Sequence, residues 1–381
     1  MKKAIVIGSF GCGNKGDDAI LDGLNAVIGK KYKLVPTSGN YGGLEKILDY
    51  NCDIIPLRLN EGISLNILVS VCGFLIKYIR ELQNADCLIV GGGSLIHDIT
   101  VYNLPFYKII CTIAKVMKTP IFFIGVGAGP LNTKRGRKLA ANILKNADKV
   151  IIREKADYNL LSEIGVNNHI LSVDNAFAGN IDNVSSKDLL SENSLSPKKY
   201  VIVTACQWFK SDNFWKKESM DFSTEKEIFV KSILSAHDAL DMQFVFLPTV
   251  MHDKQLGMEI ESSIGEQWFH CLSDNYSCRE MAAIIAESYM VYGMRMHSLI
   301  LAIRAGVPFV ASLYDDKVRH LIQRLGMDKY MLEFDELKTE KIIDTFNSLI
   351  SNYDVISDTL CKCANEYKNI CVANINKVFT E

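Results

Sequence analysis

The stretch YMVYGMRMHSLILAIRAGVPFVASLYDD, Tyr289 to Asp316, contains a strand, a polar corner, a helix and a second strand. Met290 to Tyr292 is short and apolar, as expected of a parallel strand that is covered on both faces. The following helix is predicted to end at Gly306. Open α/β sheets bind ligands where a strand gives way to a helix. Arg295 and His297 lie at such a corner, so we expect it to be functional.

The same strand-loop-helix pattern recurs upstream of this corner. Apolar strands are predicted to end in three glycine-rich stretches: Gly11 to Gly16, Gly91 to Ser94, and Gly127 to Pro130. A further predicted strand ends at Arg153. Because the carboxyl ends of parallel strands meet at one edge of a sheet, these loops are expected to lie together.

The length of 381 residues predicts two domains, at roughly 150 residues per domain. We expect an α/β fold with two Rossmann-like domains that face each other across a cleft. Four ranges are assigned on this basis. The N-terminal domain covers 1–180, a polar linker 181–199, the C-terminal domain 200–350, and a helical tail that packs back on the first domain 351–381.

Composition excludes several other classes. The formal net charge of -2 and the spread of Lys and Arg along the sequence predict neither nucleic-acid binding nor a basic surface. Eleven cysteines without a CxxC motif favour free thiols and a cytoplasmic location. The start of the chain is interpreted as a first strand rather than a signal peptide. No HxxxH or HExxH spacing occurs, so no metal site is predicted.

The segment from Ile63 to Ile79 is nearly uncharged. It is shorter than the about 20 apolar residues of a membrane-spanning helix, and Lys77 and Arg80 close it. Two interpretations remain. The segment is either a buried helix packed on the sheet or an interfacial helix that rests on a membrane.

The first glycine loop, GCGNKG, matches a dinucleotide-binding pattern but lacks its partner acid, since no Asp or Glu occurs between Gly29 and Asn40. Asp17 and Asp18 would also compete with a pyrophosphate at the helix start. The loop is therefore either a tight turn with an acidic helix start or a loop that faces the substrate.

The second loop contains Gly92, Gly93 and Ser94. Its backbone N–H groups could bind a phosphate or sugar hydroxyls, or the loop could be a packing turn.

Arg295 and His297 could form an ordinary capped surface pair at a helix start. In this position, however, the guanidinium could hold a phosphate or carboxylate through two hydrogen bonds. The imidazole could move protons to a reacting group. We favour this second interpretation because the pair occupies a strand-to-helix corner in a chain with several glycine-rich strand ends.

The motifs together resemble those of the polysaccharide pyruvyl transferases. The matching segments are GCGNKGDDAIL, GGGSLIHD, IGVGAGPL, Arg153 with Glu154, SVDNAF at Asp174, and RMHSLILAIRAGVPFVASLYDDKV. The resemblance implies the two-domain architecture of GT-B glycosyltransferases. It also implies a phosphoenolpyruvate-dependent transferase that builds a pyruvate ketal on a cell-surface sugar, in exopolysaccharide or capsule synthesis for the cell envelope.

The resemblance implies roles for individual residues. His297 is the candidate acid/base, and the donor would be held by Arg153, Arg295, Met296 and Lys317. Asn14 and Asp17 would face the acceptor or order the cleft. Phosphoenolpyruvate is the donor substrate, and no cofactor is expected. The acceptor would be a sugar, in lipid-linked form, reached at the inner face of the cell membrane.

Two other functions stay open at this point. One is a nucleotide-sugar glycosyltransferase of the same architecture, in which Asp315 or Asp316 could bind ribose hydroxyls. The other is a non-catalytic sugar-binding module for envelope assembly.

Overall fold

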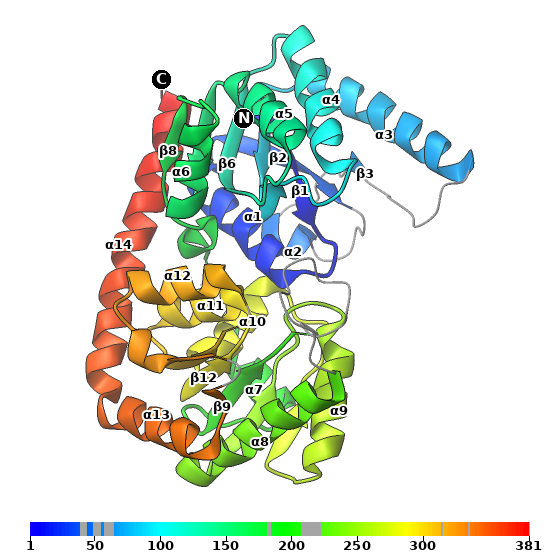
Figure 1. Cartoon of the computed structure of the whole chain (residues 1–381). Helices are drawn as coiled ribbons and strands as arrows, with labels where there is room; N and C mark the ends of the chain where they lie inside the picture. The colour runs from blue at the N-terminus through cyan, green and yellow to red at the C-terminus, as the bar shows by residue number, and fades with distance from the viewer. Residues whose placement is uncertain are drawn as a thin grey trace. The chain divides into compact units, whose positions relative to one another are not determined.

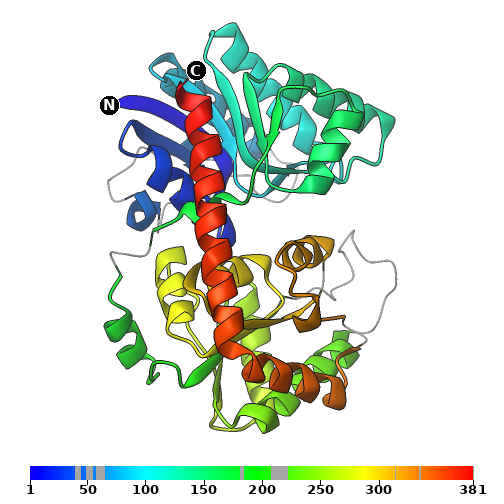
Figure 2. The same ribbon diagram turned by 90° about the vertical axis from the view of Figure 1, so that its left-hand side faces the viewer.

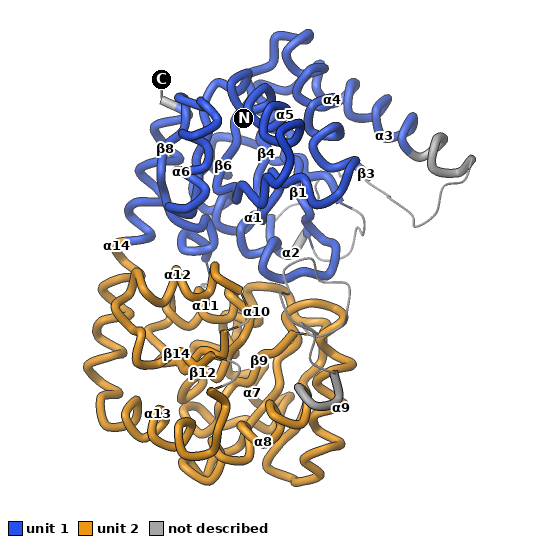
Figure 3. Tube along the Cα trace, in the orientation of Figure 1, with its two compact units in different colours: residues 1–180, 367–381 blue, residues 181–366 orange. Residues whose placement is uncertain are grey.

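The computed structural model describes most of the chain: residues 1–38, 44–48, 55–56, 65–180, 184–206, 222–313, 315–333 and 336–380. The chain divides into two compact units (Figure 3). Unit 1 comprises Met1–Asn180 and Tyr367–Glu381, and unit 2 comprises Ile181–Glu366. Each unit contains a parallel sheet with helices (Figure 1). The prediction of two Rossmann-like α/β domains is confirmed, whereas their arrangement across a cleft stays a prediction.

Unit 1 is built on an eight-stranded sheet with the order β3-β2-β1-β4-β6-β7-β8, in which β5 pairs with β6. The strands are β1 (Lys2–Phe10), β2 (Tyr32–Ser38), β3 (Ile55–Pro56), β4 (Cys87–Gly91), β5 (Ser94–Ile96), β6 (Ile121–Ala128), β7 (Lys149–Ile152) and β8 (His169–Leu171). Every pair is parallel. Ile5, Val6, Leu88 and Ile89 are fully buried, which explains why these strands are apolar on both faces.

Helices cover both faces of this sheet. They are α1 (Lys15–Ile28), α2 (Leu44–Leu48), α3 (Leu65–Gln83), α4 (Asn103–Val116), α5 (Lys134–Lys145), α6 (Lys155–Glu163) and the 3-10 helix η1 (Asn175–Ala178). Phe123 shares a core with residues of α3, α4 and α5. Its neighbour Phe122 points the other way and packs edge-on against Phe379, with ring centroids 5.3 Å apart. The alternation along β6 therefore separates two helical layers.

Unit 2 repeats the plan with six strands in the order β11-β10-β9-β12-β13-β14. The strands are β9 (Tyr200–Thr204), β10 (Gln243–Phe246), β11 (Phe269–Cys271), β12 (Met290–Gly293), β13 (Phe309–Ser312) and β14 (Met331–Leu332). The helices are α7 (Ser186–Glu192), α8 (Phe222–Leu240), α9 (Asp253–Ile264), α10 (Cys278–Ala286), α11 (Met296–Ala305), α12 (Asp316–Arg324), η2 (Asp328–Tyr330) and α13 (Thr339–Ser351).

The two segments predicted as linker and tail have regular structure. The stretch 181–199 contains α7, which Ser185 caps through the backbone N–H of Asp188, and Leu189 and Leu190 are buried. The tail consists largely of α14 (Tyr353–Thr380), the long helix in Figure 2. Its residues up to Glu366 belong to unit 2, and those from Tyr367 belong to unit 1.

Candidate active site

The predicted site residues of unit 1 lie where β1, β4 and β7 end. Asn14 caps α1: its side-chain oxygen accepts a hydrogen bond from the backbone N–H of Gly16 at 3.0 Å. Its amide nitrogen donates to Asp17 Oδ2 at 2.9 Å. The backbone N–H of Gly11 donates to Asp18 Oδ1 at 2.8 Å. Asp17 and Asp18 thus accept hydrogen bonds from residues of the GCGNKG loop. In a dinucleotide-binding loop, a pyrophosphate would accept hydrogen bonds at the start of this helix.

Asp18 is an unusual carboxyl group because it is buried beside the loop. Burial raises the pKa of Asp18 to about 6, although the hydrogen bond from Gly11 and the charge of Lys15 act in the opposite direction. The group can therefore gain or lose a proton near neutral pH.

The loop after β4 needs glycine at two positions. Gly92 and Gly93 have φ values of 89° and 77°, which favour glycine. A Cβ atom at Gly93 would also lie 2.9 Å from Asp17 Oδ1. Asp17 therefore lies close to Gly93, as the sequence pattern predicts for neighbouring strand ends.

Arg153 follows β7 and forms a buried ion pair. Its Nη1 lies 2.7 Å from Asp174 Oδ2, and the two side chains are 3% and 5% exposed. Its Nη2 donates to Ser94 Oγ at 3.4 Å. Asp174 is itself fixed, because its Oδ1 accepts from the backbone N–H of Ala176 at 2.9 Å. Among the described residues, Nε of Arg153 has no hydrogen-bond partner.

Burial and several nearby carboxylates shift the pKa of Arg153 in opposite directions. Burial would lower the pKa of this guanidinium, but the carboxylates of Asp174, Glu154 and Asp17 outweigh burial and raise it. Arg153, Ser94, Gly93, Asp17 and Asn14 therefore form one connected group in unit 1.

In unit 2, Arg295 lies between β12 and α11 and occupies the N-cap position of that helix. Its guanidinium binds Asp253 through two hydrogen bonds, from Nε to Oδ2 at 3.1 Å and from Nη2 to Oδ1. Asp253 is 1% exposed, whereas Arg295 is 24% exposed. Asp253 also accepts from Thr249 Oγ1 and from the backbone N–H of Val250, both at 3.0 Å. The carboxylate is thus held from three directions and orients the arginine.

Hydrogen bonds tie the first turn of α11 to the sheet. Ser298 Oγ donates to the carbonyl of Arg295 at 2.6 Å and lies 2.8 Å from Thr204 Oγ1 at the end of β9. Met296 is buried, and His297 is half-buried in the same turn. The imidazole therefore stands on a rigid corner, two residues from the guanidinium.

Lys317 lies in the first turn of α12, after β13. Its Nζ is 3.6 Å from Asp315 Oδ2, and its backbone N–H donates to Asp315 Oδ1 at 2.9 Å. Since β13 pairs with β12, Lys317 follows a strand adjacent to the one that precedes Arg295. The second unit thus brings an arginine, a histidine and a lysine to neighbouring strand ends. Such donors suit a ligand that has a phosphate and a carboxylate.

The site residues predicted from the sequence do not include Asp174 and Asp253, the two aspartates that bind the arginines. Asp174 enters the sequence analysis only as part of a motif, and Asp253 is not among the predicted site residues. The sequence shows that Asp174 follows one predicted strand and Asp253 another, but it does not show which arginine each aspartate meets. Among the residues that the structure describes, no group of three or more His, Cys, Asp or Glu could hold a metal ion.

The sequence matches the family model of polysaccharide pyruvyl transferase over residues 14–316. The chain belongs to this family. The match includes every predicted site residue except Lys317, which lies one position beyond it. The chain is also 22% identical over 407 residues to the amylovoran biosynthesis protein AmsJ of Erwinia amylovora, covering 96% of both chains.

Solved structures resemble this chain in fold. UDP-GlcNAc 2-epimerase from Neisseria meningitidis has a TM-score of 0.64 at 12% identity, covering 100% of both chains. A glycosyltransferase from Rickettsia africae has a TM-score of 0.62 at 12% identity, covering 99% of this chain and 97% of the other. At such identities the comparison supports the two-domain α/β fold alone.

Proposed function

We propose that this protein transfers the enolpyruvyl unit of phosphoenolpyruvate to two hydroxyls of one sugar. The product is a pyruvate ketal, and phosphate is released. The sugar belongs to a cell-surface polysaccharide or to its lipid-linked precursor. Membership of the family and the likeness to an amylovoran biosynthesis protein support a role in exopolysaccharide synthesis. The observation that carries the proposal is the corner at Arg295 and His297, where Asp253 orients a partly exposed guanidinium.

The reaction needs an acid/base group and cations that bind the donor, and Arg295 and His297 at that corner could supply both. A proton is added to the methylene carbon of phosphoenolpyruvate, which gives an oxocarbenium-like centre at the neighbouring carbon. One sugar hydroxyl attacks this centre and loses its proton. Departure of phosphate and attack by the second hydroxyl close the ketal. An acid/base group acts more than once, and such a group typically contributes roughly 10²- to 10⁴-fold to the rate. We assign this role to His297.

The remaining residues are assigned to binding. Arg295 and Lys317 hold the phosphate or carboxylate of the donor in unit 2, and Met296 lines the donor site. In unit 1, Asn14 and Asp17 face the acceptor. The resemblance implies that Arg153 holds the donor, but its side chain is 3% exposed and paired with Asp174, so we assign it to ordering the strand ends of unit 1. The backbone of Gly92, Gly93 and Ser94 offers N–H groups to anionic or hydroxyl oxygens.

The location follows from the donor. Phosphoenolpyruvate is a cytoplasmic metabolite in this proposal, so the protein works in the cytoplasm, with a lipid-linked acceptor at the inner face of the membrane. Among the described residues, no helix is long and apolar enough to cross a membrane. Phosphoenolpyruvate is consumed as a substrate, and no cofactor is required.

The test is to incubate the protein with phosphoenolpyruvate and a panel of lipid-linked and nitrophenyl glycosides. We expect a product that is heavier than the acceptor by one pyruvate less one water, with one phosphate released per product. Nucleotide sugars are tested in parallel with the same acceptors. Transfer of a sugar from a nucleotide donor, without turnover of phosphoenolpyruvate, would identify a glycosyltransferase and contradict the proposal. Binding of glycosides without any turnover would indicate a sugar-binding module.

A further inference from the structure

A strongly basic surface covers one face of unit 1, away from the residues of the candidate site. It is formed by the consecutive helices α3, α4 and α5 (Figure 1). These helices contain nine Lys or Arg residues and one acidic residue, Glu81, a formal charge of +8. The whole chain has a formal charge of -2, so this layer is opposite in charge to the rest of the molecule. Four of these cations are already close together in the sequence, in KRGRK at Lys134 to Lys138, and the expectation of no basic surface is wrong.

The three helices form one continuous layer. Tyr78 Oη of α3 donates to the carbonyl of Ile110 in α4 at 3.1 Å. Lys108 and Lys115 of α4 donate hydrogen bonds to Asn142 and Asn146 at the end of α5. The cations thus line the border between α4 and α5 and continue along α5.

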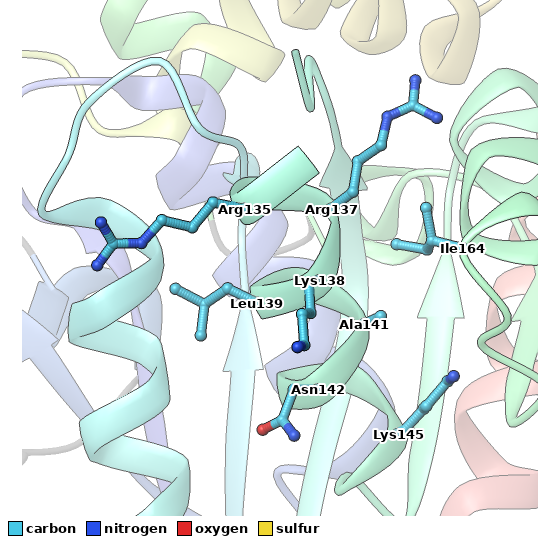
Figure 4. Close-up of a pocket in the computed structure, with 8 residues that line it drawn as sticks. All are labelled: Arg135, Arg137, Lys138, Leu139, Ala141, Asn142, Lys145 and Ile164. Atoms are coloured by element: carbon cyan, nitrogen blue, oxygen red, sulfur yellow. The ribbon is translucent and has the colours of Figure 1, made fainter. Parts of the chain in front are cut away.

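The cations of α5 are largely unneutralised. Figure 4 shows Arg135 and Arg137 extending away from each other, with Lys138 and Lys145 farther along the helix. These side chains border a surface depression of about 700 Å³, which none of the predicted site residues line. Within the described part of the chain, one carboxylate lies near the α5 cations: Oε2 of Glu163 is 3.9 Å from Nη1 of Arg137.

Large apolar side chains are exposed in the same layer. Ile76 in α3 is 53% exposed, and Ile109 and Val116 in α4 are 51% and 78% exposed. Phe74 and Tyr78 on the opposite side of α3 are buried in the core. Within the described residues, the uncharged segment at Ile63 to Ile79 buries Phe74 and Tyr78 and exposes Ile76. Its contact with a membrane stays a prediction. Residues 63–64 and the side chains of residues 65–70 lie outside the described part.

We propose that the outer face of α3, α4 and α5 docks on an anionic lipid bilayer. Apolar side chains that enter the interface together with surrounding cations are the two contributions from which peripheral membrane binding is built. Isoleucine and valine fit the acyl boundary, and the arginines and lysines fit phosphate headgroups. A neutral bilayer would use only the apolar part, so the charge of this face specifies an anionic one. The inference extends beyond the proposed reaction and does not depend on its donor.

The experiment is cosedimentation of the full-length protein with vesicles. One set contains equal parts of phosphatidylglycerol and phosphatidylcholine, and the other contains phosphatidylcholine alone. We expect binding to the anionic vesicles that weakens as NaCl is raised, because salt screens the contribution of the cations. Equal binding to both vesicle types would overturn the proposal.

Charge reversal on α5 locates the surface. We expect Arg135→Glu with Lys138→Glu to lower the partition coefficient by about 30-fold or more, at about fivefold per lost cation. The matched control is Lys341→Glu with Lys362→Glu, two exposed lysines of α13 and α14 in unit 2. It changes the net charge equally and should alter binding by no more than about twofold. Equal losses in both variants would show that total charge, rather than this face, directs binding.

The apolar part is tested separately with Ile109→Ser and Val116→Ser combined. We expect about tenfold weaker binding to anionic vesicles with an unchanged melting temperature, since both side chains are exposed. If the unaltered protein instead forms a dimer that this variant dissociates, and vesicles do not bind, a second copy covers the face and the proposal is wrong. Turnover of a water-soluble acceptor should be unaffected by any of these variants, so failure of docking and failure of the proposed reaction are distinguishable.

Discussion

Arg153 in unit 1 and Arg295 in unit 2 occupy comparable positions beyond the carboxyl end of a parallel strand, and each is paired with an aspartate. Their surroundings differ. The side chain of Arg153 is 3% exposed, whereas that of Arg295 is 24% exposed although its partner Asp253 is buried. Arg153 is shielded from water and bound to Asp174 and Ser94, so it mainly connects the strand ends of unit 1. Arg295 retains a surface that a ligand can reach.

The largest expected effect is on turnover, and it tests whether His297, two residues from Arg295, acts as the acid/base group. His297→Gln keeps a hydrogen-bonding side chain but cannot act as an acid near neutral pH. We expect turnover of phosphoenolpyruvate to fall by roughly 10²- to 10⁴-fold with little change in donor affinity. The control is His252→Gln, because His252 is exposed and makes no side-chain cap to α9. A His297→Gln variant that keeps turnover but binds the donor weakly would assign the imidazole to binding.

The next prediction compares how much the loss of Arg153 or of Arg295 lowers the free energy of unfolding. Arg153→Met leaves Asp174 as a buried carboxylate without its ion-pair partner, and we expect the free energy of unfolding of unit 1 to fall by about 3–5 kcal/mol. Arg295→Met should cost unit 2 about 1–2 kcal/mol, because Thr249 and the backbone of Val250 still bind Asp253. Hydrogen exchange of backbone amides, resolved by unit, measures both losses. Similar losses would mean that both arginines serve the fold.

A third prediction uses the pH dependence of unit 1. Burial raises the pKa of Asp18 from 3.8 to about 6, so the folded state binds more protons than the unfolded state between these values. The free energy of unfolding should therefore decrease as pH rises from about 4 to about 6, by about 3 kcal/mol in total, and stay lower above that range. Asp18→Asn removes this group and keeps an acceptor for Gly11. Its stability relative to the unaltered protein should rise over the same interval, and a constant difference would contradict the assignment.

The smallest effect concerns geometry at the exposed arginine. Arg295→Lys keeps the charge but loses the planar fork that binds Asp253. We expect the apparent KM for phosphoenolpyruvate to rise about tenfold, equivalent to about 1.4 kcal/mol, with kcat changed less. Arg153→Lys serves as the contrast, with a lower stability of unit 1 and a donor KM within about twofold of the original. Reversal of this pattern would place the donor on the unit 1 side.

The sequence predicts the fold well because strands and glycine-rich strand ends are local features. Met290 to Gly293, the corner after it and the αL residue Gly306 at the end of α11 appear where the pattern places them. Arg153 and Arg295 could be selected for the same reason, since each lies within two residues of the end of an apolar strand. The roles of these residues stay predictions.

Contacts between distant segments could not be predicted in this way. Asp174 meets Arg153 and Asp253 meets Arg295 only because separate strands end at the same edge, and local periodicity contains no information on which side chains then pair. The basic face has the same origin. The cluster KRGRK at the start of α5 is visible in the sequence, but the cations of α3 and α4 come from helices separated by strands and loops and join it only after folding.

The division of α14 between the units has a consequence for synthesis on the ribosome. Cys371 and Ile375 are fully buried and belong to unit 1, whose other residues end at Asn180. At about 5–20 residues per second, translation of the intervening segment takes roughly 10–40 s. During that interval the nascent first sheet lacks part of its helical cover, because the segment around Phe379 that packs on Phe122 has not yet been made. Unit 1 therefore starts to form first but is completed last.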